Sequence, residues 1–234
     1  MVFIRSLIFL LLQVIITPLY ALLAIFTFPF RPVTRYQIIS GWALSMLWLL
    51  RVVCGIRMVV RGAENIPTTP CVVLCKHQSA WETMALQKVF PPQVWVLKRE
   101  LLFFPFFGWG LAMTSPVAIR RGNGREAIMQ LLSQGQQRLQ QGFCVVIFPE
   151  GTRVPYGQRV KYKSGGAQLA ISSGVPVVPV AHNAGKLWGK GSFLKFPGVI
   201  TMSIGQPIDP AGLKADEVTQ RVAAWIETEI THLS

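Results

Sequence analysis

The feature that most constrains this chain is an apolar run near its N-terminus. Residues 6–30 form 25 consecutive positions without a charge, bounded by Arg5 and Arg31. As an α-helix this run would be roughly 37 Å long, enough to cross a hydrocarbon core of about 30 Å. A cleaved signal peptide is the competing interpretation, but the run is too long and lacks a convincing cleavage site. We therefore expect a membrane anchor.

A second apolar run covers residues 36–50, between Arg35 and Arg51. As a helix it would be roughly 22 Å long, which is short for a full span. Two geometries fit: a spanning helix followed by an interfacial one, or a two-helix hairpin that enters one leaflet. Both place the remainder on the arginine-rich side, which the positive-inside rule makes cytoplasmic. We expect residues 1–60 to form a two-helix anchor and residues 61–234 a separate domain.

The charge distribution favours lipid as the acidic partner. The net charge is +13, only 14% of residues are charged, 51% are hydrophobic, and no acidic residue precedes Glu64. Nucleic-acid-binding proteins usually concentrate lysine and arginine on a polar face or tail, whereas the basic residues here flank apolar runs. Such residues gain about 1 kcal/mol each from anionic headgroups. We expect an anionic membrane surface as a partner and no nucleic acid.

Four cysteines lie in apolar surroundings and predict no metal site. Cys71 and Cys75 stand near His77, but no second pair of ligands completes a zinc pattern. On a strand the two sulfurs would share one face as small buried groups. We expect Cys54, Cys71, Cys75 and Cys144 to be reduced core thiols of a protein in the cytosol.

Beyond residue 62, short runs rich in valine and isoleucine alternate with helical patterns. This alternation predicts an α/β fold with a mixed, largely parallel sheet flanked by helices. The predicted strands are 56–61, 71–75, 94–97, 116–119, 144–148, 177–181 and 199–204. The predicted helices are 81–89, 124–140, 165–172 and 216–231.

His77 lies at the carboxyl end of the predicted strand 71–75, where open α/β sheets place ligand sites. An imidazole there is suited to act as a general base. If the chain bends, the carboxylate of Glu82 can accept the imidazole N–H and fix its tautomer. The alternatives are an ordinary loop histidine and a capping box formed by Ser79 and Glu82. Both roles of Glu82 are compatible, since one carboxylate oxygen can cap the helix while the other faces the imidazole.

A second candidate group, FPEGTR at 148–153, follows another predicted strand. Gly151 lets the backbone approach a ligand, Thr152 offers a hydroxyl and an amide, and Arg153 can bind phosphate in a bidentate manner. A plain strand-to-loop turn is the alternative. Two further predicted strands also end in basic residues, which suggests an anion-binding crevice along one edge of the sheet; these residues are Lys98, Arg99, Arg120 and Arg121.

Four segments, in this order and spacing, resemble the motif blocks of the 1-acyl-glycerol-3-phosphate acyltransferase family: KHQSAWE, LKRELLFFPFFGWG, FPEGTR and VVPVAHNAG. The resemblance covers about residues 62–207, and the later AGKLWGKGSFLKFPG is similar to bacterial members. It implies that His77 is the catalytic base, oriented by Glu82. It also implies that the second and third blocks bind substrate, with Pro179 positioning the acyl chain or donor; the matching residues are Lys98, Glu100, Arg121, Glu150, Gly151, Thr152 and Arg153.

Three positions depart from the family pattern. Glu82 replaces the more usual aspartate, Arg120 stands where many relatives carry aspartate, and Val154 replaces a common serine. None of these changes removes a group that the implied mechanism needs.

The implied reaction moves a fatty acyl group from acyl-CoA or acyl carrier protein to the sn-2 hydroxyl of 1-acyl-glycerol-3-phosphate, giving phosphatidic acid. Lys98, Arg121 and Arg153 would hold the phosphate, and neither a metal nor a further cofactor would be needed. The resemblance places this step of phospholipid biosynthesis at the bacterial inner membrane, with the catalytic domain facing the cytoplasm. Two alternatives remain: acylation of another lysolipid, such as a lysophospholipid or lyso-ornithine lipid, and a non-catalytic protein that binds anionic lipid.

Overall fold

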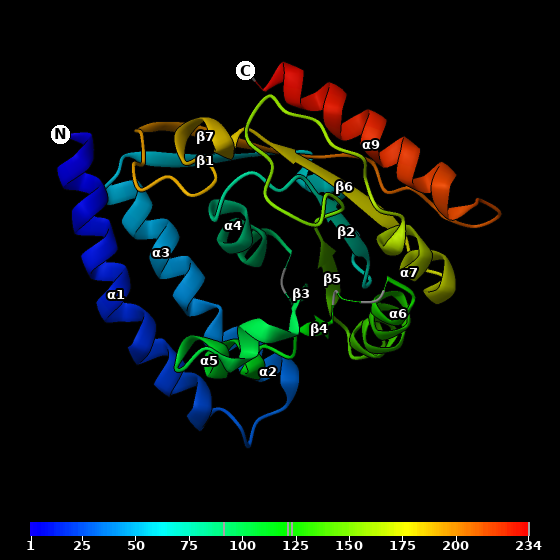
Figure 1. Ribbon diagram of the computed structural model, residues 1–234, viewed down its shortest axis with the longest axis horizontal. Helices are drawn as coiled ribbons and strands as arrows, with labels where there is room; N and C mark the ends of the chain where they lie inside the picture. The colour runs from blue at the N-terminus through cyan, green and yellow to red at the C-terminus, as the bar shows by residue number, and fades with distance from the viewer. Residues whose placement is uncertain (91, 121, 123, 234) are drawn as a thin grey trace.

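A seven-stranded sheet forms the centre of the fold (Figure 1). The computed structural model describes residues 1–90, 92–120, 122 and 124–233. The strand order is β1-β7-β6-β2-β5-β3-β4, and all neighbours are parallel except β6 and β7. The strands are β1 (Ile56–Arg61), β2 (Val72–Cys75), β3 (Gln93–Lys98), β4 (Val117–Ile119), β5 (Cys144–Ile147), β6 (Val177–His182) and β7 (Gly198–Ile204). The predicted mixed, largely parallel sheet is confirmed, with each strand within one residue of its expected ends.

The central strands are buried on both faces, which explains their continuous apolar sequences. In β2, Val73 and Cys75 pack into one hydrophobic cluster, whereas Val72 and Leu74 pack into a second cluster on the opposite face. Cys71 lies on the same face as Cys75, as predicted. All four cysteines are buried and free.

Helices cover both faces of the sheet (Figure 1). One face carries α3 (Gly41–Val52) and α4 (Trp81–Val89), and the other carries α6 (Gly124–Gln140), α7 (Gly165–Ser173) and α9 (Ala215–His232). The four helices predicted beyond residue 62 are therefore confirmed. The structure adds shorter elements that the sequence patterns did not predict: α5 (Phe107–Met113), α8 (Ala184–Leu187), and the 3-10 turns η1 (Ala63–Asn65) and η2 (Arg99–Phe103).

The second apolar run does not form one helix, so that expectation is wrong. The chain forms α2 (Pro32–Ile39), breaks at Ser40, and begins α3 at Gly41. A Cβ atom at position 41 would lie 3.2 Å from the hydroxyl of Tyr20, so the glycine lets α3 begin close against α1 (Val2–Phe26). Glycine also disfavours a helix interior. Three helices, not two, precede β1.

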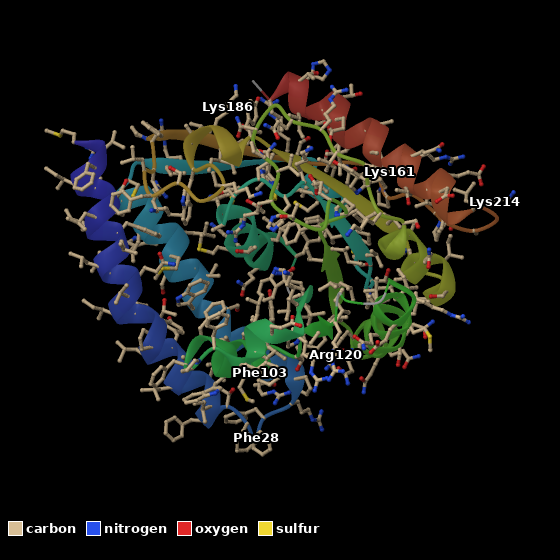
Figure 2. All side chains as sticks on the ribbon, viewed as in Figure 1. Phe28, Phe103, Arg120, Lys161, Lys186 and Lys214 are labelled. Carbon is tan, nitrogen blue, oxygen red and sulfur yellow. The ribbon has the colours of Figure 1, made fainter. Side chains whose placement is uncertain are left out.

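The first helix, α1, is apolar and largely exposed. It is long and apolar enough to cross a membrane, and only four of its side chains are buried: Ser6, Phe9, Ala21 and Ala24. It is nevertheless attached to the rest of the fold. The N–H of Lys195 donates to Ser6 Oγ at 2.9 Å, and Trp42 Nε1 of α3 donates to Thr17 Oγ1 at 3.1 Å. Leu12 and Ile16 pack against the core, and Figure 2 shows other side chains along the outer side of α1 pointing away from the body of the protein.

Candidate active site

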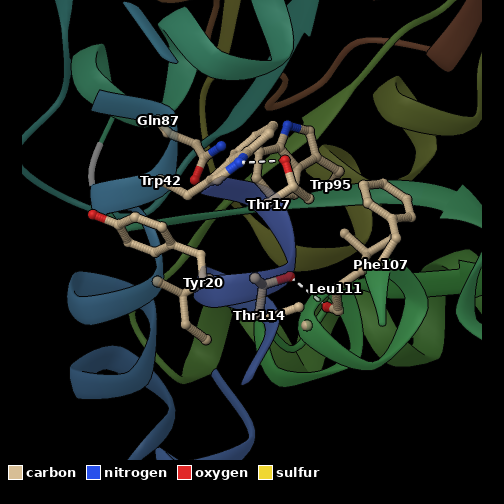
Figure 3. Close-up of a pocket in the computed structure, with 11 residues that line it drawn as sticks. Thr17, Tyr20, Trp42, Gln87, Trp95, Phe107, Leu111 and Thr114 are labelled. Carbon is tan, nitrogen blue, oxygen red and sulfur yellow. Dashed lines mark hydrogen bonds between the residues drawn. The ribbon is translucent and has the colours of Figure 1, made fainter. Parts of the chain in front are cut away.

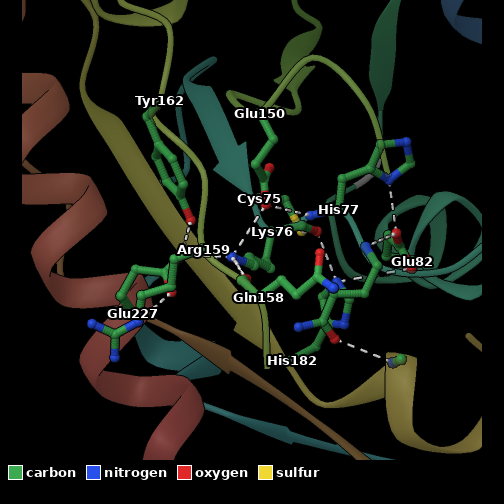
Figure 4. Close-up of polar contacts among 12 residues, drawn as sticks. Cys75, Lys76, His77, Glu82, Glu150, Gln158, Arg159, Tyr162, His182 and Glu227 are labelled. Carbon is green, nitrogen blue, oxygen red and sulfur yellow. Dashed lines mark hydrogen bonds and ion pairs between the residues drawn. The ribbon is translucent and has the colours of Figure 1, made fainter. Parts of the chain in front are cut away.

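The structure brings His77 and Glu82 together at the carboxyl end of β2 (Figure 4). His77 Nδ1 lies 2.8 Å from Glu82 Oε1. The imidazole also stacks on Phe148, with ring centroids 3.8 Å apart and planes inclined by 12°. The side chain of His77 is 14% exposed, while that of Glu82 is fully buried. The imidazole is thus held from one edge and one face, and Nε2 is directed away from Glu82.

Glu82 also organises the start of α4. Its Oε1 atom accepts the main-chain N–H groups of Gln78 at 2.9 Å and Ser79 at 2.8 Å, as well as the imidazole contact. The expectation that one carboxylate oxygen caps the helix while the other faces the imidazole is therefore wrong, because Oε1 does both. The helix begins one residue later than a capping box would place it: Ala80 is the N-cap, and Ser79 Oγ accepts the N–H of Trp81 at 3.2 Å.

A second histidine, His182 at the end of β6, lies behind this pair. Its Nε2 is 3.8 Å from Glu82 Oε2 and 2.8 Å from the carbonyl oxygen of Lys76, while its Nδ1 accepts the N–H of Ala184. These contacts correspond to a neutral imidazole with the proton on Nε2. Complete burial lowers the pKa of His182, against the attraction of Glu82.

The carboxylate of Glu82 stays ionised although it is buried. Burial raises its pKa, but the adjacent imidazole of His182, the contact with His77, and the Ser79 amide outweigh burial and lower the pKa overall. An ionised carboxylate on Nδ1 leaves the lone pair of Nε2 available to accept a proton. This is the geometry that a general base requires.

The loop that follows β5 is joined to His77 through the main chain. The N–H of His77 donates to Glu150 Oε1 at 3.3 Å, and the N–H of Val154 donates to the carbonyl oxygen of His77 at 2.7 Å. Gly151 has a φ of 72°, a conformation that glycine adopts without strain. The two segments KHQSAWE and FPEGTR, far apart in the sequence, therefore form one local structure.

Beneath His77 lies a buried ion cluster that the sequence patterns did not predict (Figure 4). Lys76 is 1% exposed, and its Nζ lies 2.5 Å from Glu227 Oε1 on α9 and 3.4 Å from Glu150 Oε1. Tyr162 Oη donates to Glu227 at 2.9 Å. Burial raises the pKa of Glu150 to about 7, with Lys76 opposing the shift. Lys76 adjoins the predicted base in sequence, which was a usable signal, but nothing in the sequence connects Glu227 to this site.

The basic residues assigned to phosphate binding differ in how the structure places them. Arg153 is half-buried, and its Nε is buried with no hydrogen-bond partner in the described part of the chain. Lys98 ends β3 and is exposed. Thr152 is exposed beside Arg153. Arg121 lies outside the described residues, so its assignment stays a prediction. Across the residues that the structure describes, neither Arg153 nor Lys98 has a carboxylate within ion-pair distance.

Parallel strands bring these residues to one edge. β2 lies between β6 and β5, β3 follows β5, and β4 follows β3, so the carboxyl ends of five parallel strands meet there. The expected strand-end arrangement is therefore present, with the His77 strand beside the strand that leads to Arg153.

An apolar cavity of about 80 Å³ lies between the N-terminal helices and the sheet (Figure 3). Its walls include Tyr20 of α1, Trp42 of α3, Gln87 of α4 and Trp95 of β3. Gln87 follows Glu82 by five residues on α4, which corresponds to about 7.5 Å along the helix axis. The cavity therefore lies on the same side of the sheet as the helix that carries Glu82.

A family model described as Acyltransferase matches residues 57–183, a segment that includes His77, Glu82 and the loop to Arg153. The chain belongs to the acyltransferase family. It is similar to the 1-acyl-sn-glycerol-3-phosphate acyltransferase of Pseudomonas aeruginosa, with 47% identity over 209 residues, 88% of this chain and 81% of the relative. It is 28% identical to the beta 1-acyl-sn-glycerol-3-phosphate acyltransferase of Homo sapiens over 87% of this chain and 74% of the relative.

A solved structure supports the fold of this acyltransferase. The crystal structure of the 1-acyl-sn-glycerophosphate (LPA) acyltransferase from Thermotoga maritima matches it with a TM-score of 0.81 and 23% identity, covering 98% of this chain and 95% of the other. The family resemblance and the enzyme class expected from the sequence are confirmed.

Proposed function

We propose that this enzyme transfers a fatty acyl group from an acyl thioester to the sn-2 hydroxyl of 1-acyl-glycerol-3-phosphate, giving phosphatidic acid. The acceptor assignment rests on one observation: a candidate general base lies in the same local structure as an arginine that is available to bind an anion. His77 is held by an ionised Glu82, and the same local structure contains Arg153, whose buried Nε lacks a protein partner in the described residues. The relatives named above support this acceptor.

In the proposed mechanism, His77 Nε2 takes the proton of the acceptor hydroxyl as that oxygen attacks the thioester carbonyl. Glu82 stabilises the imidazolium that forms, because its Oε1 lies 2.8 Å from Nδ1. Breakdown of the tetrahedral intermediate expels the thiolate, which recovers the proton from His77. The acyl group passes directly to the acceptor, and the acyl-CoA or acyl carrier protein is a co-substrate rather than a bound cofactor.

Arg153, Lys98 and Arg121 would hold the acceptor phosphate. A guanidinium forms a planar, bidentate pair with phosphate oxygens. Fixing the phosphate beside His77 places the hydroxyl near Nε2, so that binding energy is used for positioning.

The loop after β5 is the better candidate for stabilising the oxyanion. At the start of α4, the amides of Gln78 and Ser79 already donate to Glu82, and that of Trp81 donates to Ser79. The amide of Gly151 donates to the carbonyl of Phe148. We therefore assign this role to the amide of Thr152.

The apolar cavity beside α4 would receive part of an acyl chain. Its walls are mostly aromatic and aliphatic, with Thr17, Gln87 and Thr114 as polar residues, and it adjoins the exposed helix α1. We further propose that α1 anchors the enzyme to the inner membrane with the active site on the cytoplasmic side, since arginines flank the apolar runs.

One assay tests the acceptor and the donor together. Purified enzyme is given 1-acyl-glycerol-3-phosphate with acyl-CoA or acyl carrier protein in turn, and product lipids are read by mass. The same donors are offered with lysophospholipids and lyso-ornithine lipid as acceptors. Phosphatidic acid should be the main product. A higher rate on a phosphodiester or phosphate-free acceptor would overturn the assignment, and no transfer to any acceptor would leave a lipid-binding protein.

A further inference from the structure

A cluster of exposed aromatic side chains follows β3, far in sequence from the N-terminal helices. None of the residues of η2 is buried, and Phe103 and Phe104 are 71% and 58% exposed. We call this cluster the aromatic segment; its exposed apolar residues are Leu101, Phe103, Phe104, Phe106, Phe107 and Trp109. Phenylalanine side chains this exposed are unfavourable in water, and a contiguous group of them marks an interaction surface.

The backbone of the aromatic segment is folded so that the aromatic rings remain outside. A Cβ atom at Gly108 would lie 2.4 Å from the carbonyl oxygen of Leu102, so only glycine allows the chain to turn this tightly. Phe106 has a φ of 60°, which L-residues rarely adopt, and its ring is half-exposed. A conformation of this kind persists only where the surrounding structure holds it. The exposure is therefore a property of the fold and not of a loose loop.

The aromatic segment is continuous with the exposed surface of α1. At Gly110 of α5, a Cβ atom would lie 3.3 Å from Ala21 Cα, so α5 packs directly on α1 through small residues. Figure 2 shows Phe28, just beyond α1, and Phe103 at the same end of the molecule. Phe28 is as exposed as Phe103, at 71%. Two segments separated by some 75 residues in sequence thus present one apolar surface.

Cations border this surface. Lys98 and Arg99 precede the aromatic segment, Arg31 follows Phe30, and Arg120 lies along the same lower side in Figure 2; all four are exposed. Glu100 is the one acidic residue between Lys98 and Arg120. Aromatic rings beside lysine and arginine match a bilayer interface with anionic headgroups, where apolar groups enter the acyl region and cations remain at the phosphates.

We propose that the aromatic segment inserts into the same leaflet as α1 and forms a second membrane contact beside that helix. The occupant of this surface is an anionic lipid leaflet rather than another protein. Because the aromatic segment begins three residues after Lys98, insertion holds the end of β3 at the level of the lipid headgroups. An acceptor can then move laterally from the leaflet to the active site without leaving the interface. This last step rests on the proposed function, whereas insertion itself does not.

Insertion is tested by fluorescence on the full chain bound to vesicles of phosphatidylethanolamine and phosphatidylglycerol. All four native cysteines are buried, so a thiol-reactive NBD dye will report on an introduced cysteine. Phe103→Cys is compared with Gln137→Cys, an exposed position on α6. We expect lipids brominated in the acyl chain to quench the dye at 103 and aqueous iodide to quench the dye at 137. Quenching of both sites by iodide would overturn the proposal, and so would protection of position 103 from both quenchers, which would place this segment against a second copy of the chain.

Acceptor entry is tested separately by kinetics. The double variant Phe103→Ser with Phe104→Ser should raise the apparent KM for long-chain acceptor in vesicles by roughly three- to tenfold, because less apolar area enters the interface. Its kcat, and its kinetics with a monomeric short-chain acceptor, should match those of the wild type. An equal loss on both acceptors would show a role in the fold instead. Absence of activity in the wild type would contradict the proposed function while leaving the fluorescence result valid.

Discussion

Two regions of this molecule reverse the usual distribution of side chains. The outer face of α1 is apolar and exposed, with Val14, Ile15 and Leu19 each 60% exposed or more. The interior beneath His77 is charged, with Lys76, Glu82 and Glu150 almost completely buried. In the first region apolar groups face outward, and in the second region charges face inward.

The two reversals have different physical origins. The exposed face of α1 is stable only where the surroundings are themselves apolar, which a bilayer provides. The buried charges incur a desolvation penalty wherever the protein is placed, and close pairing only partly offsets it. Groups of this kind concentrate at functional sites, where their positions are needed for chemistry. The environment therefore accounts for the first reversal, and the proposed catalytic role accounts for the second.

The largest expected effect tests whether the buried charges serve catalysis. His77→Ala should lower turnover by about 10²–10⁴-fold, because the proposed general base is lost. Membrane association should be unchanged, since α1 is not altered. Product formation is followed by lipid mass, with His232→Ala, an exposed histidine at the end of α9, as the matched control. A His77→Ala enzyme that keeps more than a tenth of the wild-type rate would contradict the assignment.

The second prediction concerns the stability of the ion cluster. Lys76→Met leaves Glu150 and Glu227 without their shared cation, and should reduce the free energy of unfolding by about 3–5 kcal/mol. Arg159→Ala removes a partner of the same Glu227, but the Arg159 side chain is 66% exposed; this change should cost less than about 1 kcal/mol. Denaturant unfolding in detergent compares the two. Equal losses would show that burial of Lys76 has no energetic consequence.

The third prediction concerns the acceptor phosphate. Arg153→Ala should raise the apparent KM for 1-acyl-glycerol-3-phosphate by about tenfold or more, with a smaller change in kcat, because a charge-assisted pair is lost. The KM for an acceptor that lacks the phosphate should not change. Initial rates at varied acceptor concentration decide this, and an unchanged KM would place the phosphate site elsewhere.

The fourth prediction distinguishes Glu150 from Glu82 by how the contribution of each side chain to stability changes with pH. The raised pKa of Glu150, from 4.5 to about 7, means that the folded state binds its proton more tightly than the unfolded state. Its contribution to stability is therefore complete below pH 4.5 and is lost as the pH rises through about 7. The lowered pKa of Glu82 gives the opposite sign, with stability lost as the pH falls.

Glu150→Gln should remove the loss of stability that occurs as the pH rises toward 7. The loss of stability at low pH, which depends on Glu82, should remain. Thermal unfolding of the variant and the wild type, measured in detergent over this pH range, makes the comparison. If both proteins lose stability equally as the pH rises toward 7, Glu150 is not the group that titrates.

The smallest expected effect concerns the outer region. Ile15→Ser should change the free energy of unfolding in detergent by no more than about 0.5 kcal/mol, because Ile15 is 61% exposed and its loss leaves no cavity. The same change should weaken binding to vesicles, measured by flotation. A marked loss of stability in detergent would mean that this face of α1 packs against protein.

The sequence predicted the sheet well because most strands are short runs rich in valine and isoleucine, with polar residues, glycine or proline near their ends. The prediction of secondary structure failed in two segments where such boundaries are less distinct. The run 36–50 carries no charge and few polar residues (Gln37, Ser40 and Ser45), so its break at Ser40 was not predicted, and the close approach of Gly41 to Tyr20 depends on tertiary packing. The segment that contains α5 includes Pro105 and two phenylalanine pairs, which obscure a helical period.

For the active site, residues within one motif were predictable and residues between elements were not. The contact between His77 and Glu82 spans five positions, so a bend in one loop brings them together. The ion pair between Lys76 and Glu227 spans 151 positions and depends on how α9 packs on the sheet. His182 stands within the quoted segment VVPVAHNAG, yet its contact with Glu82 requires the adjacency of β6 and β2.

The pairing of β1 with β7 sets an order of events during synthesis. The first strand aligns with the last, from Ile56 opposite Gly198 to Arg61 opposite Ser203. The sheet therefore cannot close at this edge until nearly the whole chain has left the ribosome, and such long-range pairing is slow. Lys195, which holds the start of α1 through Ser6, is also made late. If α1 anchors the enzyme as proposed, the nascent helix is available to the bilayer before Lys195 and β7 have been made.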